Sequence, residues 1–213
     1  MDFNEIISNV KIYGLYESMV ASGYPMLINP YTSKDFCEQI DEIDSVDLIG
    51  ETTVENNNTK RAVNLASTNI GEGHDNFLNG VIIQFDLKFT VKAWTEAERY
   101  HFLDFVSSMS SMHRLTKMDY DKVFCSYVTE NTKNEMKRLL AEYNNNPCED
   151  TRLALLYNCP VGLQLTARMT TNYRQLKTIY RQRKNHALPE WKTFCKWVET
   201  LPWSELITAN TNK

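Results

Sequence analysis

Residues 170–186 read TTNYRQLKTIYRQRKNH, and the interpretation of the whole chain depends on this stretch. It follows a strand-like segment and stops short of Pro189, so its pattern predicts a helix. At about 100° per residue, Leu176, Ile179 and Tyr180 fall together on one face. The basic residues of the opposite face, which we expect to be a solvated surface, are Arg174, Lys177, Arg181 and Lys184.

Two polar residues, Asn172 and Arg183, fall with the apolar residues on the inner face of this helix. A guanidinium that faces a core must be paired or must meet a ligand anion, because an unpaired buried charge is very costly. Arg183 therefore either bonds to helix-end carbonyls or a neighbouring carboxylate, or it belongs to a ligand site. The helical pattern alone leaves both interpretations open.

The composition is that of an ordinary soluble globular protein, with 213 residues, 42% hydrophobic and 23% charged. A net charge of -4 gives no general attraction to nucleic acid. No apolar run approaches the roughly 20 residues of a membrane helix, and the acidic start lacks the basic segment of a signal peptide. Five scattered cysteines without a CxxC pair argue against a disulfide framework and a zinc site, so we expect a reduced, cytoplasmic protein.

Three segments have the pattern of strands, at residues 6–14, 81–90 and 161–170. The second and third alternate apolar and polar side chains, which is typical of a sheet with one buried face. We therefore predict an α+β fold with a mainly antiparallel central sheet covered by helices. The prediction places a single domain at residues 1–205 and a polar tail at 206–213.

Helical patterns are also present at residues 93–106, 130–143, 150–158 and 189–203. The polar segment 29–60, by contrast, is expected to be irregular, with a surface loop at its Asn-rich end.

Two further features suit a nucleotide site. Residues 107–114, SSMSSMHR, predict either a loop of hydroxyls and amides that holds phosphate, or a capped helix end and its turn. His101 lies on the apolar stripe of the 93–106 helix, as a satisfied core histidine or as a site residue. The common phosphate-loop, zinc-protease and serine-hydrolase motifs are absent. RQRKNH, residues 181–186, is either a small nucleic-acid patch or a solvated helix face.

Two separated stretches together resemble the flavin-dependent thymidylate synthases. GHDNFLNGVIIQFDLKF, residues 73–89, is similar to a histidine-bearing turn and strand of that family, and residues 99–101 fall on its Arg-His-Arg motif. CPVGLQLTARMTTNYRQLKTIYRQR, residues 159–183, is similar to its C-terminal turn, strand and helix. There, Asn172, Arg174 and Arg183 take the places of the family's Asn, Arg and Arg.

The chain departs from the family at three places. Tyr100 and His101 replace the second and third residues of the Arg-His-Arg motif. The family's Ser-x-Arg becomes Met109-Ser110-Ser111, and the next arginine, Arg114, comes three residues later. The family arginine before the C-terminal turn becomes Leu156, with Arg152 one helical turn earlier.

The resemblance implies methylation, or another modification, of deoxyuridylate at C5, with FAD as cofactor, methylenetetrahydrofolate as carbon donor and NADPH as reductant. It implies a homotetramer with shared active sites, no metal, and Arg183 as the catalytic residue facing the pyrimidine. The implied cofactor-binding residues are His74, Asn76, Arg99, His101, Asn172, Arg174 and His186. The implied substrate-binding residues are Glu96, Arg99, Ser107, Ser108, Ser110, Ser111 and Arg183.

Two alternatives remain. The first is a nucleotide- or flavin-binding or regulatory protein that keeps the family fold without the synthase reaction, which the motif departures favour. The second is a nucleic-acid-binding protein that uses the basic helix.

Overall fold

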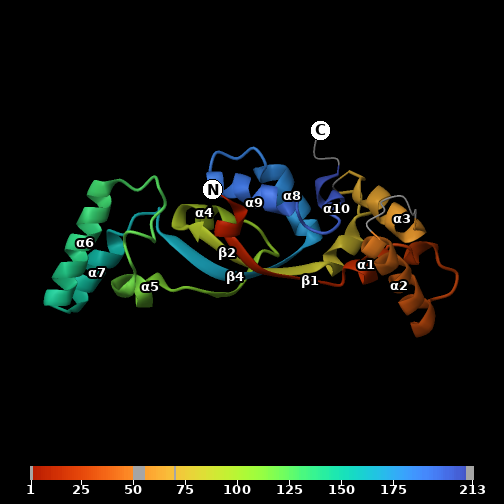
Figure 1. The fold of residues 1–213 in the computed structure, drawn as a ribbon, viewed down its shortest axis with the longest axis horizontal. Coiled ribbons are helices and arrows are strands. Elements are labelled where there is room, and N and C mark those ends of the chain that lie inside the picture. The colour runs from red at the N-terminus through yellow and green to blue at the C-terminus, as the bar shows by residue number, and fades with distance from the viewer. Residues whose placement is uncertain (1, 50–55, 70, 210–213) are drawn as a thin grey trace.

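The computed structural model describes residues 2–49, 56–69 and 71–209. A four-stranded antiparallel sheet runs through its centre in the order β1-β2-β4-β3 (Figure 1). The strands are β1 Ile7–Tyr13, β2 Ile82–Thr90, β3 Asp104–Ser108 and β4 Gln164–Asn172. This architecture confirms the predicted α+β class and the three predicted strands.

The two central strands, β2 and β4, pair without interruption from Ile82 opposite Asn172 to Thr90 opposite Gln164. Pleating directs alternate side chains of a strand to opposite faces of the sheet. Phe85, Leu87 and Phe89 of β2 are accordingly fully buried, while the polar side chains between them are half-buried. The sequence pattern had predicted this one-sided burial.

Helix α9, Pro189–Val198, lies on the buried face of the sheet (Figure 1). Its Trp197 ring centroid is 4.7 Å from that of Phe85, and its Trp191 centroid is 5.0 Å from that of Phe89. Tilted and edge-on aromatic pairs contribute about 0.5–1.5 kcal/mol each beyond the area they bury. The last long helix is thus anchored on β2 by aromatic packing.

The remaining helices form two groups at opposite ends of the sheet and a few elements beside it (Figure 1). One end carries α1 Leu15–Ala21, α2 Ser33–Ile49 and α3 Asn57–Ala66. The other end carries α5 Ser111–Arg114, α6 Glu130–Asn145 and α7 Glu149–Tyr157. Against the sheet lie α4 Val91–Ala97 and α8 Tyr173–Arg183, while α10 Glu205–Thr208 packs against α8 and α3. Short 3₁₀ turns are η1 Phe3–Glu5, η2 Tyr24–Met26, η3 Asn76–Gly80 and η4 Leu115–Lys117.

The helix predicted at residues 93–106 is wrong beyond Ala97. The chain turns at Phe102, whose φ of 66° is incompatible with a right-handed helix, and β3 begins at Asp104. β3 pairs with the edge of β4 that β2 leaves free. This strand pairing outweighs the helical pattern that the sequence has over residues 93–106.

The segment 29–60, predicted to be irregular, contains all of α2 and the start of α3. Thr32 and Asp35 cap α2 reciprocally, with Asp35 N donating to Thr32 Oγ1 at 3.2 Å and Thr32 N to Asp35 Oδ2 at 3.1 Å. Asn56 caps α3 by accepting from Asn58 N at 2.7 Å. The asparagine-rich patch therefore starts a helix instead of forming a surface loop.

The first residues of the predicted tail, 206–208, are helical, and residues 210–213 of that tail lie outside the described residues. Residues 205–208 form α10, in which Leu206 and Ile207 are fully buried and belong to the main core. These two apolar side chains lie between polar residues, so the local composition concealed them.

The basic face of α8 is exposed at Arg181, as the helical pattern predicted, but not at Lys177. Lys177 is 2% exposed, and its Nζ donates to Asp75 Oδ2 at 2.9 Å and to the Ala66 carbonyl at 2.7 Å. Arg174 Nε lies 3.2 Å from Asp75 Oδ1. The prediction failed at Lys177 because α3 and the segment leading into η3 cover this part of the face and supply the acceptors.

Replacement of Lys177 by Met should lower the free energy of unfolding by about 3 kcal/mol, because it leaves Asp75 buried with a single, partly exposed partner. Arg181→Met, at an exposed position of the same helix, should change it by less than about 0.5 kcal/mol. Urea unfolding of the two variants and the parent measures both values. Equal effects would contradict a buried ion pair at Asp75.

Candidate functional site

Arg183 lies at the C-terminal end of α8, with a side chain that is 11% exposed. Its Nη1 donates to Glu96 Oε2 at 2.7 Å, and its Nε donates to the Tyr100 hydroxyl at 2.6 Å. The guanidinium carbon lies 5.3 Å from the Tyr100 ring centroid and 5.0 Å from that of Trp191. Arg183 is therefore paired with a neighbouring carboxylate, as one of the two interpretations of its inward position required.

This pairing leaves part of the guanidinium available. Nη2 makes no hydrogen bond within the described residues, and Arg183 lines a surface pocket. Two bonds and two aromatic rings fix the plane of the group, so its remaining N–H donors have a defined direction.

Glu96 connects several charged groups around Arg183. Its Oε2 lies 3.0 Å from His186 Nε2, and its Oε1 lies 3.1 Å from Lys92 Nζ. Burial raises the pKa of the Glu96 carboxyl, but the hydrogen bond from Lys92 and the charges of His186 and Arg183 outweigh it. The net result is a pKa below the ordinary value. Glu96 is therefore a fixed anion at neutral pH.

The tautomer of His186 follows from its two contacts. Nδ1 accepts a hydrogen bond from Leu188 N at 3.2 Å, so the proton of a neutral imidazole is on Nε2, which faces Glu96. This places His186 beside Glu96, which also pairs with Arg183.

Tyr100 is a residue whose role the sequence did not reveal. Its hydroxyl accepts from Arg183 and donates to Gln182 Oε1 at 2.9 Å. Burial raises the pKa of Tyr100 although the Arg183 charge opposes the shift, so the hydroxyl stays protonated at neutral pH. The sequence feature that could have indicated this role is the replacement of the motif's histidine by an aromatic residue with a hydroxyl group.

One surface pocket, here called the α8 pocket, has a volume of about 340 Å³. It brings together three predicted site residues, Arg99, His101 and Arg183. The other residues that line it are Tyr100, Phe102, Gln175, Thr178 and Gln182. Arg99 and His101 are exposed, so the interpretation of His101 as a core histidine is wrong. The two side chains and Arg183 present donors to one cavity.

The second pocket, here called the serine pocket, has a volume of about 710 Å³. Its lining residues are Ser107, Ser108, Met109, Ser110, His113, Arg114, Lys117, Met118 and Thr166. The predicted loop is in fact the end of β3 followed by the short helix α5. Ser111 lines a smaller neighbouring pocket instead.

Basic side chains surround the serine pocket, which suits an anion. Arg114, three residues late in the family motif, lines it, as do His113 and Lys117, which sequence reasoning did not single out. Arg152 approaches the same region, because its Nη2 donates to the carbonyl of Met112 in α5 at 3.2 Å.

The remaining predicted residues lie near the N-terminal end of α8. Asn172 caps the helix by accepting from Gln175 N at 2.8 Å, and Arg174 pairs with Asp75. His74 and Asn76 are exposed on either side of Asp75. The eleven-residue helix α8 runs from this end to Arg183, its last residue, over a length of about 15 Å. One chain therefore presents its predicted site residues in separate groups.

Within residues 2–49, 56–69 and 71–209, no three His, Cys, Asp or Glu side chains are placed to hold a metal ion together. No helix in these ranges combines the length and apolar character needed to cross a bilayer.

Comparison with solved structures relates this arrangement to known proteins. The chain superposes on flavin-dependent thymidylate synthase ThyX from Helicobacter pylori, complexed with FAD and dUMP, with a TM-score of 0.62 at 15% identity. The match covers 94% of this chain and 98% of that one. A second structure of Helicobacter pylori ThyX with FAD and dUMP gives a TM-score of 0.64, again at 15% identity, over 95% and 96% of the two chains.

No protein-family model and no curated protein sequence matches the chain. The likeness therefore resides in the backbone, with few shared side chains. The chain has the fold of the flavin-dependent thymidylate synthases.

Proposed function

We propose that the protein binds a deoxyuridylate-like nucleotide together with FAD and modifies the pyrimidine at C5, with methylenetetrahydrofolate as carbon donor and NADPH as reductant. The observation that carries the proposal is Arg183, a cation held by Glu96, Tyr100 and two aromatic rings at the wall of a pocket that it shares with Arg99 and His101. The proteins with this fold are complexed with FAD and dUMP, which supports the choice of ligands.

The chemistry requires a positive charge at the uracil ring. A donor at a carbonyl oxygen or ring nitrogen draws electron density toward itself and helps C5 to act as a nucleophile. The free edge of the Arg183 guanidinium can donate to such an atom, and its low exposure strengthens the interaction relative to water. Glu96 and Tyr100 then act as positioning residues.

The serine pocket suits the nucleotide phosphate. Hydroxyls of Ser107, Ser108 and Ser110 and the cations Arg114 and Lys117 line one cavity, and this combination of donors and charge is what a phosphate monoester requires. Arg114 would thereby replace the arginine that the family motif places earlier.

The flavin would be held by groups near the N-terminal end of α8. Exposed His74 and Asn76 and the partly exposed Arg174 offer donors that fit flavin ring atoms and phosphates. Asn172 retains an amide N–H₂ group, because only its carbonyl oxygen is used in capping. Reduced FAD supplies the hydride when bound, and the protein supplies position and charge.

The separation of these groups favours a homotetramer with shared sites. The two ends of α8 are about 15 Å apart, and the serine pocket and the α8 pocket have no lining residue in common. A neighbouring subunit can place its own copy of one group against another, which would complete the site.

The second candidate is a nucleotide- or flavin-binding protein without turnover. It is favoured by Glu96, because an anion 2.7 Å from Arg183 offsets the charge that the reaction requires. The nucleic-acid alternative loses support, because Lys177 is buried and Arg174 is paired on the face that such binding would use.

Absorption spectra of the purified protein distinguish these candidates. The proposal predicts a flavin spectrum after incubation with FAD and a further shift when dUMP is added. The binding-only candidate predicts the same spectra without folate-dependent formation of a C5-modified nucleotide. A protein that takes up no FAD in a fluorescence titration would contradict both.

Arg183→Lys should lower turnover at least about 100-fold, because an ammonium cannot keep both partners and also direct an N–H at the pyrimidine. Arg181→Lys, at an exposed position two residues earlier in α8, should leave turnover within about twofold. Assays are compared with thermal melts of both variants. A loss of turnover that merely tracks a loss of stability would show that Arg183 is structural.

Because the pKa of Glu96 is lowered in the folded protein, we expect its carboxylate to stabilise the fold in a pH-dependent way. The contribution of ionised Glu96 to the free energy of unfolding is present above the ordinary glutamate pKa of 4.5, and it is lost as the pH falls through the lower folded-state pKa. Glu96→Gln should therefore lose less stability than the parent between pH 6 and about pH 3. Unfolding free energies at the two pH values test this, with the exposed Glu149→Gln as control. Identical acid sensitivity in parent and Glu96→Gln would contradict the assignment.

A further inference from the structure

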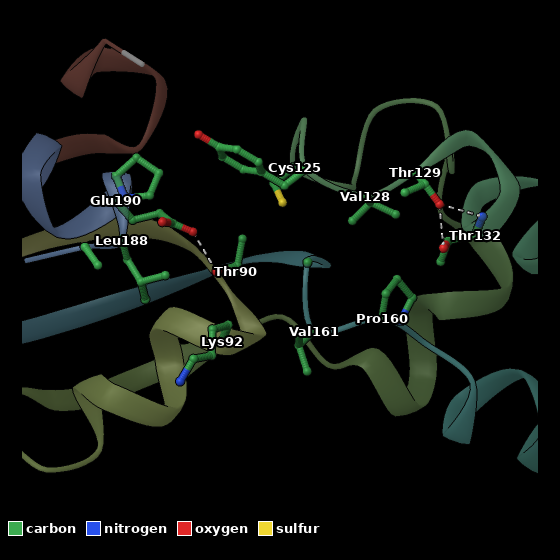
Figure 2. A pocket seen from close by; sticks show the side chains of 14 residues that line it. Thr90, Lys92, Cys125, Val128, Thr129, Thr132, Pro160, Val161, Leu188 and Glu190 are labelled. Carbon is green, nitrogen blue, oxygen red and sulfur yellow. Dashed lines mark hydrogen bonds between the residues drawn. The ribbon is translucent and has the colours of Figure 1, made fainter.

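A third pocket, here called the Glu190 pocket, has a volume of about 580 Å³ and shares no lining residue with the α8 pocket or the serine pocket. Figure 2 shows its walls at the junction of β2 with α4, the turn before β4, and the beginnings of α6 and α9. It lies where β2 ends and β4 begins, and the proposed reaction does not use it.

The polar group that distinguishes this pocket is Glu190, which is 4% exposed. Its Oε1 accepts from the Thr90 hydroxyl at 2.7 Å, as Figure 2 shows. The Thr90 oxygen is itself engaged, because it accepts from Ala93 N at 3.2 Å to cap α4. In the described part of the chain Glu190 has no other hydrogen-bond or ion-pair partner. One carboxylate oxygen and a lone pair of the other thus remain unmatched.

Among the described residues, no cation forms an ion pair with this carboxylate. Lys92 lines the same pocket, but its Nζ is 3.1 Å from Glu96 Oε1. A buried carboxylate with the Thr90 hydroxyl as its single hydrogen-bond partner is costly, and paired N–H donors reduce that cost. The site therefore lacks a group with two N–H donors in one plane.

The remaining walls are mostly apolar, with the hydroxyls of Thr129 and Thr132 as exceptions. The apolar side chains are those of Val128, Pro160, Val161, Leu188 and Pro189. Tyr127 also lines the pocket although it is 79% exposed, so its ring can pack against a ligand. Apolar walls with one or two polar groups that set orientation are typical of sites for small flat molecules.

We propose that the Glu190 pocket binds a flat heterocycle whose edge carries a ring N–H beside an exocyclic amino group, as in the 2-amino-4-oxopyrimidine edge of guanine and pterin rings. The two N–H donors meet the two carboxylate oxygens of Glu190, and the ring faces lie against the apolar walls and Tyr127. This recognition requires neither flavin nor deoxyuridylate.

The test is isothermal titration of the purified full chain, without flavin, with two pairs of matched probes. Guanosine and pterin carry the amino group, whereas inosine lacks it and lumazine has a carbonyl oxygen in its place. At least one amino-bearing probe should bind tenfold or more tightly than its match. Whether guanosine or pterin is preferred identifies the source of the ring.

Two variants and a control connect that binding to the pocket. Glu190→Gln keeps the shape and the bond from Thr90 but turns one acceptor into a donor, so binding should weaken at least tenfold. Val161→Trp, at a position 60% exposed, should fill the pocket and abolish binding while thermal melting stays unchanged. Glu149→Gln, exposed on α7 and outside the pocket, should bind like the parent.

Three results would overturn the proposal: no saturable binding of guanosine or pterin, equal binding of the matched rings, or binding that neither Glu190→Gln nor Val161→Trp reduces. Because no flavin or turnover is measured, these results leave the proposed reaction untouched, and failure of the reaction leaves this test untouched.

Discussion

The uninterrupted pairing of β2 with β4 is the constraint on which the rest of the structure depends. It fixes Asn172 opposite Ile82, and the same Asn172 caps α8, so the sheet register sets where the helix starts. From that start, helix geometry alone carries Arg183 back over the sheet to Glu96 and Tyr100. Positioning of the candidate cation is thus a consequence of strand pairing and one cap.

Much of this could be predicted from the sequence, because local periodicity contains it. The alternation in β2 and β4 gave the strands and their buried face, and helical phase put Arg183 on the inner side of α8. Helical periodicity, however, gives only the direction in which each side chain leaves the helix axis. It does not show how much of the helix surface neighbouring elements cover. Lys177 was misplaced for that reason, since its partner Asp75 lies 102 positions away in the chain.

The other incorrect predictions arose where long-range interactions outweighed the preference of the local sequence. Residues 93–106 have a helical stripe, but the unpaired edge of β4 offers backbone hydrogen bonds to β3 that no local pattern signals. Tyr100 and Glu190 share this dependence on distant partners, Arg183 in one case and Thr90 in the other. The chemistry of both sites depends on these contacts between residues far apart in the sequence. The residue types could suggest candidates, but only the fold could show which residues are their partners.

The position of β4 next to β2 has a consequence for how the chain can vary. The chain leaves the β2–β4 ladder at Thr90 and returns to it at Gln164, directly opposite. Within this connection, α6 and α7 pack around a small hydrophobic core of their own. Closing a longer loop costs little, only about 0.6 kcal/mol for each doubling of length. Insertions, deletions and sequence drift can therefore accumulate around α6 and α7, while the β2–β4 pairing that positions the site keeps its register.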